Sequence, residues 1–195
     1  MERDRDVGVF ISGWGGPGFE WIISPIRKMS DIFFETHVLH PQGFGWGDIQ
    51  GSAERLCAFS SRFLPERNVF YVGHSMGGLV AKAAQEMVDV AGLVTIGTPH
   101  KGTPVASLAP WSRSARQMMP DSSFIAANAS VPSMAPMLNI ACRFDELVFP
   151  HSSAVHPVAD DVRWVNHTHM SAIFSKKVAN IVVDYLKDIQ KALYK

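Results

Sequence analysis

Short apolar runs alternate along this chain with longer stretches in which apolar residues recur every three or four positions. Most of the runs are nearly continuous in branched aliphatic and aromatic residues, which is typical of strands covered on both faces of a parallel sheet. We therefore expect strands at residues 7–12, 36–39, 69–72, 93–96, 137–142 and 162–165.

The stretches between these runs have the spacing of amphipathic helices. Helices are expected at the stripe of Trp21, Ile22, Ile26 and Met29, at 48–63 with Asp48 as the capping residue, at 79–88 and at 173–193. Strands that alternate with helices predict an α/β fold, a doubly wound sheet of about six mostly parallel strands with helices on both faces.

One segment interrupts the alternation. Residues 100–136 contain five prolines and many Ser, Met and Ala residues, and the segment is too long for an ordinary connection between a strand and a helix. We expect a small inserted cap here, with short helices at 112–119 and 121–129 on either side of Pro120. The 195 residues are otherwise expected to form one domain spanning 1–195.

Composition and charge narrow the function classes. The chain is 47% hydrophobic, and its 18 basic and 18 acidic residues cancel, so no global field favours nucleic acid or an anionic membrane. No apolar run approaches the roughly 18 residues of a membrane span, and the charged opening does not resemble a secretory signal. Two cysteines without C-x-x-C spacing support neither a disulfide framework nor a thiolate metal site. We expect a cytoplasmic protein without stable membrane anchoring.

The motif that carries chemistry is Gly73-His74-Ser75-Met76-Gly77, between the third expected strand and a helix. A Gly-x-Ser-x-Gly sequence in this context is typical of a nucleophile elbow, in which a strained turn presents a serine hydroxyl above the carboxyl edge of the sheet. The alternative is a glycine-rich turn with a capping serine. We interpret Ser75 as a nucleophile, with residues 73–78 forming the turn and His74 shaping it.

A serine nucleophile needs a base, and the base needs an acid that orients it. In an open α/β sheet both should follow the carboxyl ends of strands. Asp145 follows the fifth strand by three residues, and Glu146 is its nearest competitor. The loop after the sixth strand offers His167 and His169 as bases. The remaining loop histidines, His37, His151 and His156, are expected in solvent.

Stabilisation of an oxyanion requires backbone N–H groups near the serine. One donor is expected from Met76, the residue after the nucleophile, and the second from the loop after the first strand, where we favour Trp14 over Gly15. The glycines of the loop after the first strand could alternatively do no more than build a turn.

Two blocks carry a family resemblance, Gly73-His-Ser-Met-Gly-Gly78 and Gly97-Thr-Pro-His-Lys-Gly-Thr103. With the order Ser75, Asp145, His169, the chain resembles the α/β-hydrolase superfamily and, within it, the bacterial lipases and esterases. The resemblance implies a minimal α/β-hydrolase fold and a serine carboxylic-ester hydrolase that works through an acyl-enzyme without a cofactor or metal. It also favours His169 as the base. The chain departs from the family in lacking two opening strands and in having Ser12 where many members have histidine. Because the opening does not resemble a secretory signal, we expect an intracellular esterase rather than a secreted lipase.

Apolar residues in the loops at this edge suggest where an acyl chain binds. Trp46, Met118 and Phe149 are expected to contact the substrate, although each could instead only pack the cap onto the domain. We expect a small-molecule acyl ester with an apolar chain as substrate. The same residues would also serve an acyl thioesterase, an acyl-carrier methyl esterase or an acyltransferase, and a ligand receptor without turnover is the alternative from another class.

Overall fold

A computed structural model of the chain describes residues 5–28 and 32–195. The last residue of the first expected helical stripe, Met29, and the charged opening residues 1–4 lie outside the described residues. The strands are β1 (Asp6–Ile11), β2 (Glu35–Leu39), β3 (Asn68–His74), β4 (Gly92–Ile96), β5 (Met137–Cys142) and β6 (Asp161–Val165). The helices are α1 (Phe19–Ile23), α2 (Pro25–Lys28), α3 (Ile49–Phe63), α4 (Met76–Ala84), α5 (Arg113–Gln117), α6 (Ser123–Ser130) and α7 (Lys176–Leu193).

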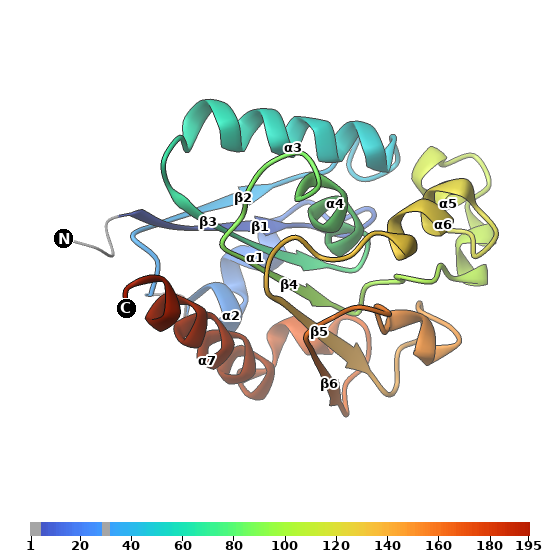
Figure 1. The fold of residues 1–195 in the computed structure, drawn as a ribbon. Helices are drawn as coiled ribbons and strands as arrows, with labels where there is room; N and C mark the ends of the chain where they lie inside the picture. The colour runs from blue at the N-terminus through green and yellow to red at the C-terminus, as the bar shows by residue number, and fades with distance from the viewer. Residues whose placement is uncertain (1–4, 29–31) are drawn as a thin grey trace.

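The strands form one six-stranded sheet in the order β2-β1-β3-β4-β5-β6, and every neighbouring pair is parallel. Figure 1 shows α3 and α4 on one face of this sheet and α1, α2 and α7 on the other. Two apolar cores result, one on each face. The predicted doubly wound architecture is therefore confirmed, because strands buried on both faces must be covered by helices on both sides.

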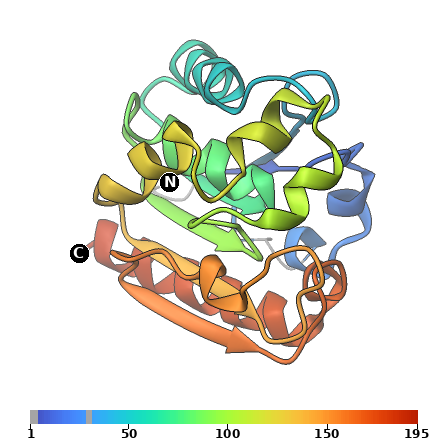
Figure 2. The same cartoon turned by 90° about the vertical axis from the view of Figure 1, so that its right-hand side faces the viewer.

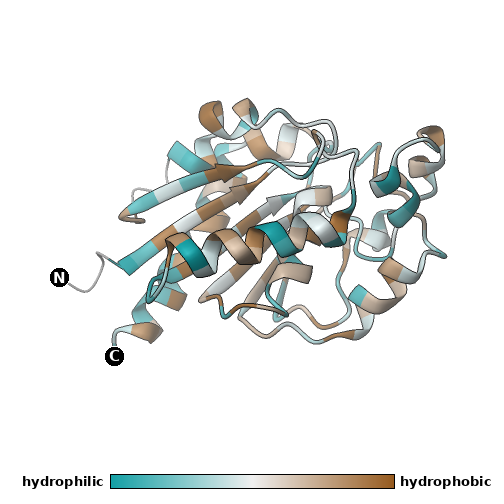
Figure 3. Ribbon diagram, turned by 90° about the horizontal axis from the view of Figure 1, so that it is seen from above, coloured by the Kyte–Doolittle hydropathy of each residue, from teal (hydrophilic) through white to brown (hydrophobic). Residues whose placement is uncertain are grey.

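The helices α3, α5, α6 and α7 each begin at a polar side chain that accepts a hydrogen bond from a free N–H group of the first turn. The Asp48 carboxylate caps α3 by accepting a hydrogen bond from the Gly51 N–H at 3.0 Å, as expected from the sequence. Figure 3 shows α3 with mixed hydrophilic and hydrophobic residues lying across the more hydrophobic strands. The final helix is shorter than expected, because Ser175 caps α7 and the preceding Ser171–Phe174 form a separate 3-10 turn, η4.

The last helix is tied to the first strand by a buried carboxylate. Asp6 is fully buried in β1, and it accepts hydrogen bonds from the side chains of Gln190, Asn68 and Tyr194. A buried carboxylate is tolerated only when such donors surround it. This cluster joins the N-terminal ends of β1 and β3 to the end of α7.

The segment between β4 and β5 contains a 3-10 turn, η2 (Pro104–Leu108), followed by α5 and α6. Serine side chains at positions 112 and 122 cap the two helices, within two residues of the predicted starts. Viewed toward the carboxyl ends of the strands, these short elements lie at the end of the sheet where the loops after β1 and β3 also gather (Figure 2). The segment is thus placed beside the turn that contains Ser75.

Candidate active site

The turn between β3 and α4 is a single residue. The strand continues to His74 and the helix starts at Met76, so the wider turn expected over 73–78 is wrong, as is a helix starting at residue 79. Ser75 alone reverses the chain with φ 56° and ψ −129°, a conformation that residues with a side chain adopt at a cost of about 1–3 kcal/mol. The hydroxyl is thereby held at the carboxyl edge of the sheet on two rigid elements.

The glycines around Ser75 are required by close backbone approach. A Cβ atom at Gly73 would lie 2.5 Å from the Gly77 carbonyl oxygen, and one at Gly77 would lie 2.6 Å from the Ser12 carbonyl oxygen. A Cβ at Gly78 would overlap the Thr98 side chain. The helix can therefore pack directly against β1 and the loop after β4 only with these residues, which is the physical reason for the Gly-x-Ser-x-Gly-Gly pattern.

Asp145 and His169 form a buried pair at the same edge. The His169 Nδ1 lies 2.9 Å from each carboxylate oxygen, and the two side chains are 2% and 0% exposed. Because the carboxylate accepts the Nδ1 proton, the neutral ring keeps Nε2 as a proton acceptor. Glu146 accepts the His169 backbone N–H at 3.0 Å and so holds the main chain rather than the ring. His167 instead bonds to Ser171 in an exposed loop.

The carboxylate of Asp145 is held in its charged form. Burial by itself raises the pKa of Asp145, but the hydrogen bond and charge of His169 together with the backbone N–H groups of Val148 and Leu147 lower it below its usual value overall. The Asp145 carbonyl oxygen also accepts a hydrogen bond from His151 Nε2 at 3.0 Å. Hydrogen bonds therefore fix both the side chain and the backbone of Asp145.

The pair lies next to Ser75 through the end of β4. The Ser75 N–H donates to the Ile96 carbonyl oxygen at 2.8 Å. A Cβ at the following residue, Gly97, would lie 3.2 Å from Asp145 Oδ2 and 3.4 Å from His169 Nδ1. Within the part of the chain that the structure describes, no hydrogen bond joins Ser75 Oγ to His169 Nε2. Such contacts commonly tighten only when substrate is bound.

The His74 side chain packs against His169, a contact that the sequence analysis did not predict. Its Nε2–H donates to the His169 carbonyl oxygen at 3.1 Å, and the two ring centroids are 4.7 Å apart. Burial, with a smaller contribution from the His169 charge, lowers the pKa of His74 to about 3. The ring is neutral and packs against the imidazole. Its position directly before the serine, on a strand buried on both faces, is the signal that could have identified it.

The two residues expected to donate to an oxyanion lie next to residues of the serine turn, because Met76 follows Ser75 and Trp14 follows Gly13 in the loop after β1. A Cβ at Gly13 would lie 3.0 Å from the Ser75 Cβ, so the loop after β1 touches the nucleophile. Among the described residues, the backbone N–H groups of Trp14 and Met76 donate to no acceptor. The Met76 N–H also lies at the first turn of α4, where the helix dipole favours negative charge.

An apolar cavity of about 230 Å³ opens beside Ser75. Its other lining residues are Trp14, Pro99, Thr103, Val105, Ala106, Leu108, Ala109, Trp111, Ala115, Met118, Leu147 and Val148. Met118, which is expected to contact the substrate, is one of these lining residues. Trp46 stacks on Trp14 with ring centroids 5.7 Å apart but does not line the cavity, and Phe149 lies outside it, 58% exposed and edge-on to His151.

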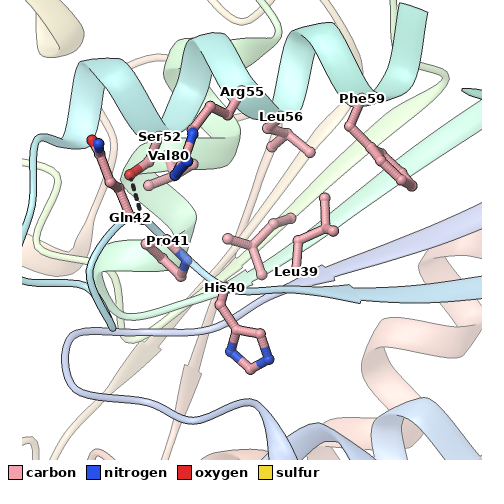
Figure 4. A pocket seen from close by; sticks show the side chains of 10 residues that line it. Leu39, His40, Pro41, Gln42, Ser52, Arg55, Leu56, Phe59 and Val80 are labelled. Atoms are coloured by element: carbon pink, nitrogen blue, oxygen red, sulfur yellow. Dashed lines mark hydrogen bonds between the residues drawn. The ribbon is translucent and has the colours of Figure 1, made fainter. Parts of the chain in front are cut away.

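A second cavity of about 180 Å³ lies between α3 and the segment after β2. Figure 4 shows Leu56 and Phe59 of α3 facing Leu39 across it, with the His40 ring pointing away from α3. The Ser52 hydroxyl in its wall accepts from Gln42 N–H and donates to a backbone carbonyl. Because the Ser52 hydroxyl already donates one hydrogen bond and accepts another, it is not available to a base as an activated nucleophile.

The loop histidines are not all solvated as the sequence suggested. His156 is only 2% exposed, and its ring lies edge-on to His100 at 4.8 Å. That expectation is wrong for His156 because Asn139 holds its backbone N–H inside the protein at 2.8 Å.

Within the described residues, no group of three or more His, Cys, Asp or Glu side chains is arranged to hold a metal ion. No helix in the described ranges is long and apolar enough to cross a membrane.

Comparisons with known proteins identify the fold. Residues 50–111 match the family model of the PGAP1-like alpha/beta domain, which covers α3, the Ser75 turn and the start of the segment after β4. No curated protein matches the chain by sequence.

Solved structures of lipases and a thioesterase are similar over nearly the whole chain. Lipase B of Aspergillus fumigatus matches 94% of this chain with a TM-score of 0.78 and 19% identity, and this chain spans 52% of that lipase. The mature Bacillus licheniformis lipase BlEst2 matches 94% of this chain and 92% of its own, with a TM-score of 0.69 and 18% identity. The RedJ thioesterase of Streptomyces coelicolor matches 94% of this chain and 89% of its own, with a TM-score of 0.60 and 12% identity. These likenesses confirm the predicted fold class.

Proposed function

We propose that this chain, which has the α/β-hydrolase fold, is a serine hydrolase that cleaves carboxylic esters of small molecules through an acyl-enzyme. The observation that carries the proposal is the strained Ser75 turn next to a buried Asp145–His169 pair at the carboxyl edge of the sheet. A plain capping turn would need neither the strain nor the buried pair. The segment over 100–136 is assigned as the cap of the single domain.

In this mechanism each residue has one role. Ser75 Oγ attacks the ester carbonyl carbon while His169 Nε2 takes its proton, and Asp145 holds the resulting imidazolium. The N–H groups of Trp14 and Met76 hold the negative oxygen of the tetrahedral intermediate. The intermediate collapses when His169 returns the proton to the leaving alcohol. Water then attacks the acyl-enzyme by the same route and releases a carboxylic acid.

The site is compatible with an acyl group because its walls are apolar. Leu108, Trp111 and Met118 contribute hydrocarbon surface next to the serine. Such a pocket stabilises an apolar chain by removing its surface from water. The expected contacts of Trp46 and Phe149 with substrate have no support from the cavity lining and stay a prediction.

The test combines covalent labelling with turnover. A fluorophosphonate should label wild-type protein once, at Ser75, and p-nitrophenyl butyrate should be hydrolysed. Ser75→Ala and His169→Gln should each lose about 10⁴-fold in kcat, as in other triads. His167→Gln is the matched control and should retain the wild-type rate. Labelling elsewhere, or full activity in Ser75→Ala, would refute the mechanism.

A parallel series of acyl thioesters distinguishes the thioesterase alternative. Tight binding of an ester without product formation would favour a receptor.

A further inference from the structure

The cavity beside Ser75 has a defined size and is closed on one side. The residues that line it divide into a buried group, which includes Ala115, Met118 and Val148 at no more than 7% exposure, and an exposed group, which includes Leu108 and Trp111 at 77% and 64%. The buried group forms the wall that faces the protein core, and the exposed group forms the rim. An acyl chain that extends from Ser75 into the cavity therefore meets this buried wall, which we call the floor.

The polar side chains that line the cavity next to Ser75 are already occupied. The Thr103 hydroxyl donates to the Leu147 carbonyl oxygen at 2.8 Å and accepts the Phe149 N–H at 3.3 Å. The Trp14 indole N–H donates to Ser112 Oγ at 3.1 Å. Burying a polar substituent against such walls would leave it without a partner, whereas a hydrocarbon chain needs none.

The floor is held in place on both sides. The Met118 N–H donates to the Ser114 and Ala115 carbonyl oxygens at 2.9 and 3.1 Å, and its carbonyl oxygen accepts the Thr103 N–H at 2.8 Å. The Ala115 N–H in turn donates to Ser112 Oγ. Because the bond from the Thr103 N–H joins the end of α5 to the loop after β4, the floor cannot move away from a longer chain without breaking it.

We propose that this cavity is the acyl-chain site and that it makes the protein selective for medium-chain acyl groups of about eight carbons or fewer. The inference rests on the proposed function and names the substrate class of that same site. A methylene group occupies about the volume of a water molecule in the liquid, about 30 Å³, and the cavity of about 230 Å³ accommodates about eight of them. Met118 at the floor and Ala106 in the wall set the limit.

The test is the dependence of kcat/KM on chain length for p-nitrophenyl esters from acetate to palmitate, each kept below its micelle-forming concentration. Each methylene buried in the site should raise kcat/KM about fourfold, up to about octanoate, and longer chains should gain nothing or lose. Met118→Ala should move the optimum to about ten or twelve carbons. Ala106→Leu, at a half-buried position that tolerates a larger side chain, should move it to about six or fewer. Met134→Ala, the same exchange at a methionine outside the cavity, should leave the profile unchanged.

Opposite shifts of the two cavity variants support the proposal. It is overturned if both variants keep the wild-type optimum while the acetate ester is still hydrolysed, or if wild-type protein prefers palmitate to octanoate. Inactivity of wild-type protein toward every ester would instead refute the proposed function. The size limit has a separate readout in that case, because binding of linear carboxylates should change Trp14 and Trp111 fluorescence, with affinity rising to about eight carbons and then levelling off. Affinity that keeps rising to dodecanoate would refute the limit without any turnover.

Discussion

Three buried neutral histidines should make this protein unusually sensitive to mild acid. Burial lowers the pKa of His74 to about 3 and that of His156 to about 4, and it holds the pKa of His100 well below its usual value. The neighbouring charge of Lys82 contributes in the same direction at His100 and His156. In the unfolded chain each imidazole should titrate near the usual pKa of about 6.5.

The sign and size of the effect follow from proton binding. Above about pH 6.5 both states are neutral at these three positions, so their contribution to stability is complete there. As the pH falls toward the folded pKa values, the unfolded chain takes up three protons that the native state does not. The free energy of unfolding then falls by up to about 4 kcal/mol per pH unit, and by about 6 kcal/mol in total at pH 5. That loss is comparable with the whole stability of a typical domain, about 5–15 kcal/mol.

Urea unfolding at closely spaced values from pH 7.5 to 4.5 measures this slope. His156→Asn is the informative variant, because an asparagine oxygen can replace His156 Nδ1 as the acceptor of the Val158 N–H without titrating. It should reduce the slope by about one third, or about 1.4 kcal/mol per pH unit. His40→Asn, at an exposed position, is the control and should keep the wild-type slope. A wild-type slope below that of one proton, or an unchanged slope in His156→Asn, would refute the reasoning.

Three further predictions follow from single contacts. Gly77→Ala places a Cβ 2.6 Å from a carbonyl oxygen just after β1, and urea unfolding should show a loss of at least about 3 kcal/mol. The control Gly51→Ala should stay within about 1 kcal/mol of wild type, because its Cβ would meet only the end of the Gln42 side chain at 3.3 Å and the Asp48 Cβ at an ordinary 3.6 Å. Asp6→Ala removes one of the two acceptors of the Gln190 amide and leaves it only the Ile32 carbonyl oxygen. The loss should cost about 2–3 kcal/mol, seen as a lower Tm; an unchanged Tm would show that the cluster adds nothing. Asp145→Asn should lower kcat about 10⁴-fold while circular dichroism shows an intact fold, and a loss below tenfold would contradict the orienting role.

The hydrophobic pattern was sufficient to locate the sheet. Five of the six strands begin and end within one residue of the predicted runs. Three of them, β1, β4 and β5, are buried along their whole length, and a strand buried on both faces must be apolar throughout. β3 is the exception at its carboxyl end. Glycine usually ends a strand, yet β3 continues through Gly73 to His74 because the reversal is concentrated at the positive φ of Ser75. Local propensity does not contain that information.

The candidate site was predictable in its residue types and only partly in its pairings. The sequence left Asp145 against Glu146 and His167 against His169. In the structure the Asp145 carboxylate contacts the His169 ring, whereas the Glu146 carboxylate accepts the His169 backbone N–H. The His167 ring instead contacts a residue of an exposed loop. Those directions depend on how the loops after β5 and β6 fold against each other.

The sequence by itself determined the α/β architecture, the capped start of α3 and the place of Ser75 between a strand and a helix, because each is visible in residues close together in the chain. Only the tertiary structure decided which carboxylate contacts the His169 ring, that His74 packs against that ring, and that Met118 lines an apolar cavity beside Ser75. These contacts join segments that are far apart in sequence. Their geometry is set by the order of the strands and by close backbone approach at glycines, and neither is encoded in a local pattern of apolar and polar residues.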